Sequence, residues 1–435
     1  MKKTGKKAME RKGISRRDFL KTSVGAAAGL AIAPMFGKSL AYGQQKPIKV
    51  VAVTHMTGPG SAMGISCTGS LNLWKEEVNA KGGILGRKVE INIMDTRGKV
   101  EEAVRLSREI ASSKEADVLF NSCSSAEAFS IKEVSRDLNF LTFATNSKTT
   151  ELTADPKTHA PFHFRVAAMN ISDMIAGAMY AGDLCKKNKW TKWATIGADN
   201  AYGRENVTLF IYYLKKFYPE AEIVTQLWPK LWEPDVTPYI SKMLGAKVQA
   251  CFTTQWGGDI TAMIQQGSLY GFYDKIKLFS IDLGDFTAIN AVVKALGKFP
   301  EGIYMGTRAN PTVPATKINQ DWFAAYLKLN KHEPTGWSQQ VYTGAKLYQT
   351  AIEKIGSTDQ KAVRDALEDL EIVGPWGSPP DSKLKMRRRD HTVIYYFQGW
   401  GRTISQSPYV TDVLALTWDK ILPAEQEYLK EKGWI

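Results

Sequence analysis

Residues 48–95 decide the fold of this chain; they read IKVVAVTHMTGPGSAMGISCTGSLNLWKEEVNAKGGILGRKVEINIMD. The continuous apolar run Ile48–Met56 predicts a buried strand, and the alternation over Val89–Met94 predicts a second one. Between them we expect a helix that ends at Ala80, just before two glycines that suit a left-handed cap. Apolar residues recur along that helix at helical spacing: Met63, Cys67, Leu71, Trp74 and Val78. Such a strand–helix–strand unit predicts a parallel sheet with a right-handed crossover.

The alternation of strands and helices continues along most of the 435 residues, a length that favours more than one domain. We predict helices at 100–111 and 125–137, and strands at 116–120 and 141–144. After Arg165 a second set follows, with strands at 193–197, 222–227, 248–253 and 277–281 and helices at 204–217, 236–244 and 259–270. The tail has predicted helices at 320–329, 339–355 and 361–370 and a strand at 392–397. Two successive doubly wound α/β halves explain this order, and the tail helices indicate that the chain recrosses between them.

The first 41 residues have the pattern of an export signal. Lysines precede the motif Ser15–Lys21, which holds the tandem arginines Arg16 and Arg17, and a small apolar run and an Ala41 cleavage site follow. The alternative is a short membrane anchor, but the apolar run of about 15 residues falls short of the roughly 20 needed to span a bilayer. We therefore expect a twin-arginine signal peptide, cleavage before Tyr42 and a periplasmic mature protein. No Cys stands near the cleavage point, which argues against a lipoprotein anchor.

The formal charge of +13 overstates the basic character of the mature chain. Ten Lys/Arg and two Asp/Glu lie in the first 41 residues, so 47 basic and 42 acidic residues remain, a charge of +5. A nucleic-acid partner is therefore not expected, and the basic cluster 383–389 is typical of a solvated face.

Motifs of enzymes and metal sites are missing from the sequence. It has no HExxH, GxSxG or Walker A motif, and its four cysteines, Cys67, Cys123, Cys185 and Cys251, form no CxxC pair. Gly58, Gly60 and Gly64 resemble a dinucleotide fingerprint, but the third glycine is one place late and Pro59 intrudes. We expect no catalytic activity, no cofactor and no metal.

Ligands of open parallel sheets bind beyond the carboxyl ends of the strands, so the loops at those ends are the candidate site. Ser124 and Ser125 open a helix after the third strand, where N–H groups and hydroxyls favour a carboxylate; plain capping by Ser124 is the alternative. Asn146 and Lys148 follow the fourth strand, where an ordinary polar loop is the alternative.

The second half offers four more candidate contacts. Tyr202 stands at a strand–helix turn and could lie over a ligand, or simply pack there. Gln255 and Trp256 follow the strand 248–253, and Trp256 could form an apolar wall or belong to the core. Asp282 could accept an ammonium, or cap a helix beginning near Asp285.

One stretch, Asn79-Ala80-Lys81-Gly82-Gly83-Ile84-Leu85-Gly86, makes a more specific comparison possible. It closely resembles the opening of the leucine/isoleucine/valine-binding family of ABC-transporter receptors. Further matches run along the mature chain: Met56-Thr57-Gly58-Pro59, Gly64, Trp74, Asp95, Ala103, Cys123-Ser124-Ser125, Glu151-Leu152-Thr153, Phe164-Arg165, Tyr202-Gly203, Tyr342, Ala345 and Ala351. The resemblance implies a type I periplasmic-binding fold, with two α/β lobes joined by three crossovers. We place residues 47–166 and 306–385 in the first lobe, and 167–305 and 386–435 in the second.

The resemblance also assigns roles. It implies that Ser124 and the loop Asn146–Lys148 hold the carboxylate of a small solute, that Tyr202 closes over it, and that Asp282 takes its ammonium. Gln255 and Trp256 would line the side-chain pocket. Asn146 and Lys148 replace the Ala and Thr usual in amino-acid receptors, which opens the choice of ligand to amides and aromatic acids.

The resulting expectation is a monomeric solute receptor that passes its ligand to the permease subunits of an ABC importer in the inner membrane. A periplasmic sensory module for a membrane receptor is the first alternative, because it uses the same fold. An exported enzyme is the second, and turnover of a bound solute would distinguish it.

Export is expected to depend on the tandem arginines. Replacing Arg16 and Arg17 with lysine keeps the charge but removes the motif, so the precursor should accumulate in the cytoplasm. Cell fractionation measures this outcome. Undiminished periplasmic accumulation of the double variant would contradict the twin-arginine assignment.

Overall fold

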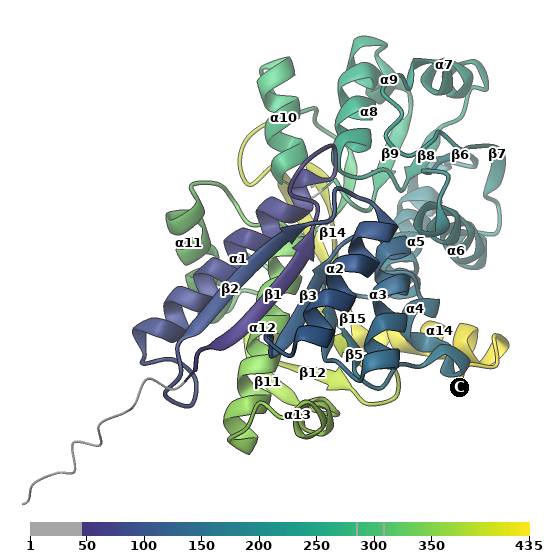
Figure 1. The fold of residues 1–435 in the computed structure, drawn as a ribbon. Helices are drawn as coiled ribbons and strands as arrows, with labels where there is room; N and C mark the ends of the chain where they lie inside the picture. Colours follow the sequence, from purple (N-terminus) through teal and green to yellow (C-terminus); the bar gives the residue numbers. More distant parts are fainter. Residues whose placement is uncertain (1–45, 284–285, 308) are drawn as a thin grey trace, which may run out of the picture. The chain divides into compact units, whose positions relative to one another are not determined.

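A computed structural model describes residues 46–283, 286–307 and 309–435. The expected signal peptide lies outside the described residues. Figure 1 shows the described chain as strands alternating with helices, with α1 (Ser61–Ala80) lying along β1 (Ile48–Thr54) and β2 (Val89–Asp95). Gly82 and Gly83 follow α1 with positive φ angles, as their sequence position predicted.

The first sheet has the strand order β11-β12-β13-β5-β4-β3-β1-β2. Strands β1 to β5 pair in parallel, and β11 and β12 extend the sheet in antiparallel fashion. Its further strands are β3 (Val118–Ser122), β4 (Thr142–Ala144), β5 (His163–Arg165), β11 (Glu371–Ser378), β12 (Lys383–Arg387) and β13 (Thr392–Ile394). The second sheet repeats this plan.

The second sheet has the order β15-β14-β10-β9-β8-β6-β7. Strands β6 to β10 are parallel, and β14 and β15 are antiparallel. The strands are β6 (Lys192–Ile196), β7 (Glu222–Leu227), β8 (Ala250–Thr253), β9 (Lys277–Ser280), β10 (Tyr304–Thr307), β14 (Phe397–Thr403) and β15 (Val410–Thr417). Two predominantly parallel α/β units therefore follow one another, as the sequence predicted.

Helices cover both faces of each sheet and bury an apolar core against it. On the first sheet, α1, α11 and α12 pack on one face and α2 and α3 on the other; on the second, α5, α6 and α14 oppose α7, α8, α9 and α10. The bounds are α2 (Val100–Ser113), α3 (Ser125–Leu138), α4 (Glu151–Ala154), α5 (Asn170–Asn188), α6 (Ala201–Phe217), α7 (Thr237–Gly245), α8 (Gly257–Leu269), α9 (Phe272–Lys275), α10 (Phe286–Leu296), α11 (Lys317–Asn330), α12 (Gly336–Ile355), α13 (Gln360–Leu367) and α14 (Trp418–Glu431). A 3-10 turn occupies Pro156–Thr158. Within the described residues, none of these helices has the length and apolar character needed to cross a bilayer.

The chain passes between the two sheets three times: after β5, after β10 and after β13. The third passage corrects the sequence-based boundary at 385/386, because the end of β12 and all of β13 pair in the first sheet. The apolar run 392–397 is likewise two elements. Its first three residues form β13 of the first sheet, and Phe397 begins β14 of the second.

Several elements had no clear signal in the sequence. The helix α5 is the largest of them; it is rich in small residues and buried on most sides, so no amphipathic stripe marks it. The four cysteines are all buried and free. Burial raises the pKa of the Cys67 thiol to about 12, which makes it unreactive.

A cluster of histidines lies between β5 and β13. The His391 ring stacks on Phe164 at 4.2 Å and meets the His159 ring at 4.7 Å. Burial, reinforced by the neighbouring His159, lowers the pKa of His391 to about 4, against the opposing effect of Glu368 at 3.4 Å. Burial also holds the pKa of His163 well below its usual range. These rings are therefore neutral in the folded protein at neutral pH.

The folded chain should lose stability in mild acid because of this cluster. Unfolded histidine binds its proton at about pH 6.5, whereas folded His391 does not, so protonation favours the unfolded chain as the pH falls below about 6.5. His391→Asn suits the left-handed backbone at this position, where φ is 47°. Between about pH 7.5 and about pH 5, the wild type should lose on the order of 2 kcal/mol more unfolding free energy than this variant, measured by denaturant titration. Equal losses would show that His391 is not responsible.

Candidate functional site

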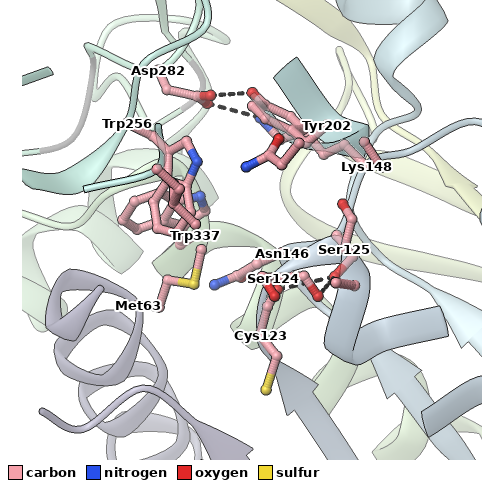
Figure 2. A pocket seen from close by; sticks show the side chains of 15 residues that line it. Met63, Cys123, Ser124, Ser125, Asn146, Lys148, Tyr202, Trp256, Asp282 and Trp337 are labelled. Carbon is pink, nitrogen blue, oxygen red and sulfur yellow. Dashed lines mark hydrogen bonds and ion pairs between the residues drawn. The ribbon is translucent and has the colours of Figure 1, made fainter. Parts of the chain in front are cut away.

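A cavity of about 110 Å³ lies where loops from the strand ends of both sheets meet (Figure 2). It is lined by Met63, Cys123, Ser124, Ser125, Ala126, Asn146, Ser147, Lys148, Asn200, Ala201, Tyr202, Leu231, Trp256, Asp282 and Trp337. Seven of the eight residues singled out in the sequence are among them. The structure therefore brings together loops that leave β3, β4, β6, β8 and β9.

The loops of the two lobes also approach each other beside the cavity. Gly257 begins α8 with φ of +53°, and a side-chain carbon there would lie only 3.0 Å from the carbonyl oxygen of Pro59. Gly258 is similarly close to the Pro59 ring. Only glycine fits this approach without displacing the Pro59 loop.

Ser124 caps the helix α3. Its hydroxyl donates to Glu127 Oε2 at 2.6 Å and accepts from the Glu127 backbone N–H at 3.5 Å, while the Ser124 backbone N–H donates to the same carboxylate at 3.1 Å. This is a complete capping box. Ser124 therefore caps α3, a role that can coexist with ligand binding, and its hydroxyl proton is already engaged.

Glu127 is a buried anion beneath the start of α3. His55 Nε2 lies 2.6 Å from Glu127 Oε2, and the Thr96 hydroxyl donates to Oε1 at 2.6 Å. Burial by itself would raise the pKa of Glu127, but His55 and the hydroxyls of Ser124 and Thr96 lower it below its ordinary value. The carboxylate therefore stays ionised and fixes the first turn of α3 at the cavity wall.

Donors remain available on this wall. The first N–H groups of an α-helix have no acceptor within the helix, and Ser125 and Ala126 hold those positions in α3. Asn146 Nδ2 is buried, points into the cavity in Figure 2 and has no hydrogen-bond partner among the described residues. Its Oδ1 accepts from the Thr145 hydroxyl at 3.2 Å, which orients the amide. These groups together suit an anionic or carbonyl oxygen.

An ion cluster closes another part of the cavity. Lys148 Nζ lies 3.0 Å from Asp282 Oδ1 and 3.4 Å from Asp173 Oδ2, and the Tyr202 hydroxyl donates to Asp282 Oδ2. Lys148 comes from the first lobe, whereas the other three side chains come from the second. Asp282 was expected to accept an ammonium, and a lysine of the chain itself provides one.

Tryptophans form the apolar wall opposite α3. The Trp256 and Trp337 rings meet edge to face at 6.2 Å, and Trp232 packs on Trp256 at 4.6 Å. Met63 and Leu231 complete this surface. The Trp232 backbone N–H donates to Asp259 Oδ2 at 3.1 Å, which attaches the Trp232 loop to α8. Burial raises the pKa of Asp259 to about 7.

Comparison with known proteins shows which family this chain belongs to. The sequence profile of a family described as "Periplasmic binding protein" matches residues 47–398, most of the chain. The chain belongs to the periplasmic binding protein family. A profile of the twin-arginine translocation signal matches residues 13–33, so this binding protein is exported to the periplasm, as its N-terminus predicted.

Relatives and solved structures agree with the family. Leu/Ile/Val-binding protein homolog 4 of Brucella abortus is 23% identical over 397 residues, covering 87% of this chain and 88% of the relative. A solute-binding protein of an ABC transporter from Rhodopseudomonas palustris, solved with 3,4-dihydroxybenzoic acid, has a TM-score of 0.73 at 18% identity and covers 85% of this chain and 98% of its own. A branched-chain amino acid transporter substrate-binding protein from Streptococcus pneumoniae, solved with isoleucine, has a TM-score of 0.72 at 15% identity and covers 85% and 99%. These structures confirm the type I fold, and the family profile confirms the non-enzymatic, solute-binding class of this binding protein.

Gln255 is the sequence-predicted residue that does not reach the cavity. It is buried next to Trp256, but successive side chains of extended backbone point in opposite directions, so only Trp256 faces the cavity. Conversely, Trp337 and Met63 line the cavity although the sequence analysis did not select them for it. Met63 had been read as core from its spacing, and Trp337 follows the cap Thr335 of α12, a signal comparable with that of Tyr202 in α6.

Ser124→Ala is expected to separate capping from binding. Losing the capping hydroxyl should lower the unfolding free energy by about 1–2 kcal/mol, because a buried carboxylate also loses a donor. Ligand affinity should change by less than about threefold, since the hydroxyl proton already goes to Glu127. Thermal melts and calorimetric titration measure the two effects, and weak binding with an unchanged melt would reverse the assignment.

Proposed function

We propose that this binding protein captures a small carboxylate of about single-ring size between its lobes and delivers it to the permease subunits of an ABC importer. The observation that carries the proposal is a wall of hydrogen-bond donors, at the start of α3 and on Asn146, facing a wall of tryptophans across one cavity.

The donor wall favours a carboxylate. Backbone N–H groups at the start of α3 and the helix dipole both attract negative charge, and the Asn146 amide adds a neutral donor. Two carboxylate oxygens can accept from all of these groups at once. Glu127 does not compete for them, since it accepts from Ser124, Thr96 and His55 on the inner side of the helix turn.

The tryptophan wall favours an apolar body on that carboxylate. Most of the remaining cavity surface is made of apolar atoms, from Trp256, Trp337, Met63 and Leu231. The space of about 110 Å³ is smaller than the roughly 150 Å³ apolar cavity that accommodates benzene, so the ligand can have no more than one ring. Structural relatives from Rhodopseudomonas palustris were solved with benzoate and with 4-hydroxybenzoate, and the carboxyl group is what these ligands share with isoleucine.

Binding by both lobes explains how capture and release would work. Ser125 and Asn146 belong to the first lobe and Trp256 and Tyr202 to the second, so a ligand that touches all four stabilises the form in which the lobes meet. The cavity is complete within one chain, which supports a monomer as the working unit. Its lining offers nothing that suits a nucleic acid.

The test is calorimetric titration of the mature protein with benzoate, 4-hydroxybenzoate, 3,4-dihydroxybenzoate and isoleucine. At least one of these carboxylates should bind, and Trp337→Ala should weaken that binding by about tenfold or more, because a buried aromatic contact is lost. Trp434→Ala is the matched control, since Trp434 is partly buried near the C-terminus and does not line the cavity. Failure of all four ligands, or equal affinities of the two variants, would overturn the proposal.

A further inference from the structure

Two acidic side chains lie buried at one end of the cavity. Asp173 is in α5 and Asp282 follows β9; their side chains are 1% and 6% exposed. Carboxylates this deeply buried must be paired with cations or protonated, because the loss of water would otherwise be very costly. Lys148, whose side chain is 2% exposed, provides a cation to both of them.

The backbone holds Lys148 in place for this contact. Its carbonyl oxygen accepts from the Asn170 backbone N–H at 2.7 Å. The buried Arg165 guanidinium donates to the next carbonyl, that of Thr149, at 2.7 Å, and contacts the Lys148 carbonyl at 3.5 Å. These contacts of Asn170 and Arg165 are made within the protein, so Lys148 is held across the lobe boundary without any help from a ligand.

Lys148 also lines the cavity, and its charged end lies beside Tyr202 and the Asp282 carboxylate (Figure 2). A solute ammonium that sought Asp282 would meet this charge at close range, and like charges repel strongly where water is excluded. A solute without an amino group meets no such repulsion.

We propose that Lys148 is the specificity-determining residue of the cavity: its ammonium occupies the cation position beside Asp282 and Asp173, so the protein selects carboxylates that carry no neighbouring amino group. This inference rests on the proposed carboxylate-binding function and narrows it to one chemical class.

Matched pairs of acids test the inference, because each pair differs only by the amino group. Phenylacetate with L-phenylglycine and 4-methylpentanoate with L-leucine are two such pairs. The wild type should bind the amino-free member of at least one pair about tenfold or more tightly than its amino acid. Lys148→Ala should abolish or reverse this preference, with the amino acid gaining about tenfold or more over its wild-type affinity, because its ammonium replaces the missing lysine. Calorimetric titration gives both ratios.

Two further variants assign the effect to charge. In the double variant Lys148→Ala/Asp282→Asn, the gain for the amino acid should disappear, since the carboxylate that would receive the ammonium is neutral. Lys148→Met keeps the apolar stem of the side chain and removes only its charge, so it should behave as Lys148→Ala does. A gain that persists in the double variant would overturn the role of Asp282, and equal wild-type affinities within both pairs would overturn selection by Lys148.

Without its buried cation, the Lys148→Ala variant could fail to fold in the absence of a ligand. Thermal melts of the variant with each acid then provide the measurement. The amino acid should raise the melting temperature of the variant, while its amino-free partner should not; the opposite ranking would contradict the inference. If the wild type bound no member of either pair and none of the four carboxylates of the first titration, the carboxylate-binding function itself would be rejected, so the two failures can be distinguished.

Discussion

The loops that leave β3, β4, β6, β8 and β9 all begin at the carboxyl ends of parallel strands, and this constraint determines where the cavity lies. Parallel strands joined by helices end at the same edge of their sheet, so residues far apart in the sequence emerge side by side. Ser124, Lys148, Trp256 and Asp282 reach one cavity for this reason. The same connection gives each helix that starts at this edge an N-terminus facing the cavity, which is how α3 presents its first N–H groups there.

Buried charge is the second organising feature, and the protein stabilises its buried carboxylates in two ways. Glu127 is stabilised within the first lobe, by His55 after β1 and by the hydroxyls of Thr96 after β2 and Ser124 at the start of α3. Asp282 is stabilised between the lobes, by Lys148 and Tyr202. The first arrangement fixes a helix end regardless of ligand. The second joins the lobes and at the same time sets the charge of the surface that a solute meets, so stability and selectivity depend on the same ion pair.

A further polar network lies beside two of the three passages between the sheets, those after β5 and after β13. Arg387 at the end of β12 pairs with Glu425 of α14 at 2.7 Å and with Asp390 at 2.6 Å, and the Ser172 hydroxyl donates to Glu425 at 2.7 Å. Arg165 links Thr392 to the loop that carries Lys148. The network ties the first sheet, α5 and α14 together next to the crossing strands.

The sequence by itself determined the alternation of strands and helices, the parallel sheets and the export signal, because these follow from local periodicity and composition. It also located seven lining residues, since strand ends are local features and their direction in a parallel sheet is fixed. It could not show that Lys148 pairs with Asp282, 134 positions away, in place of a ligand ammonium. It missed α5, whose burial on most sides removes the periodic signal, and it joined β13 to β14, whose sheets differ although their residues are nearly adjacent. Which of Gln255 and Trp256 faces the cavity was likewise decided by backbone direction. These features depend on which distant surfaces come into contact, and only the tertiary structure decides that.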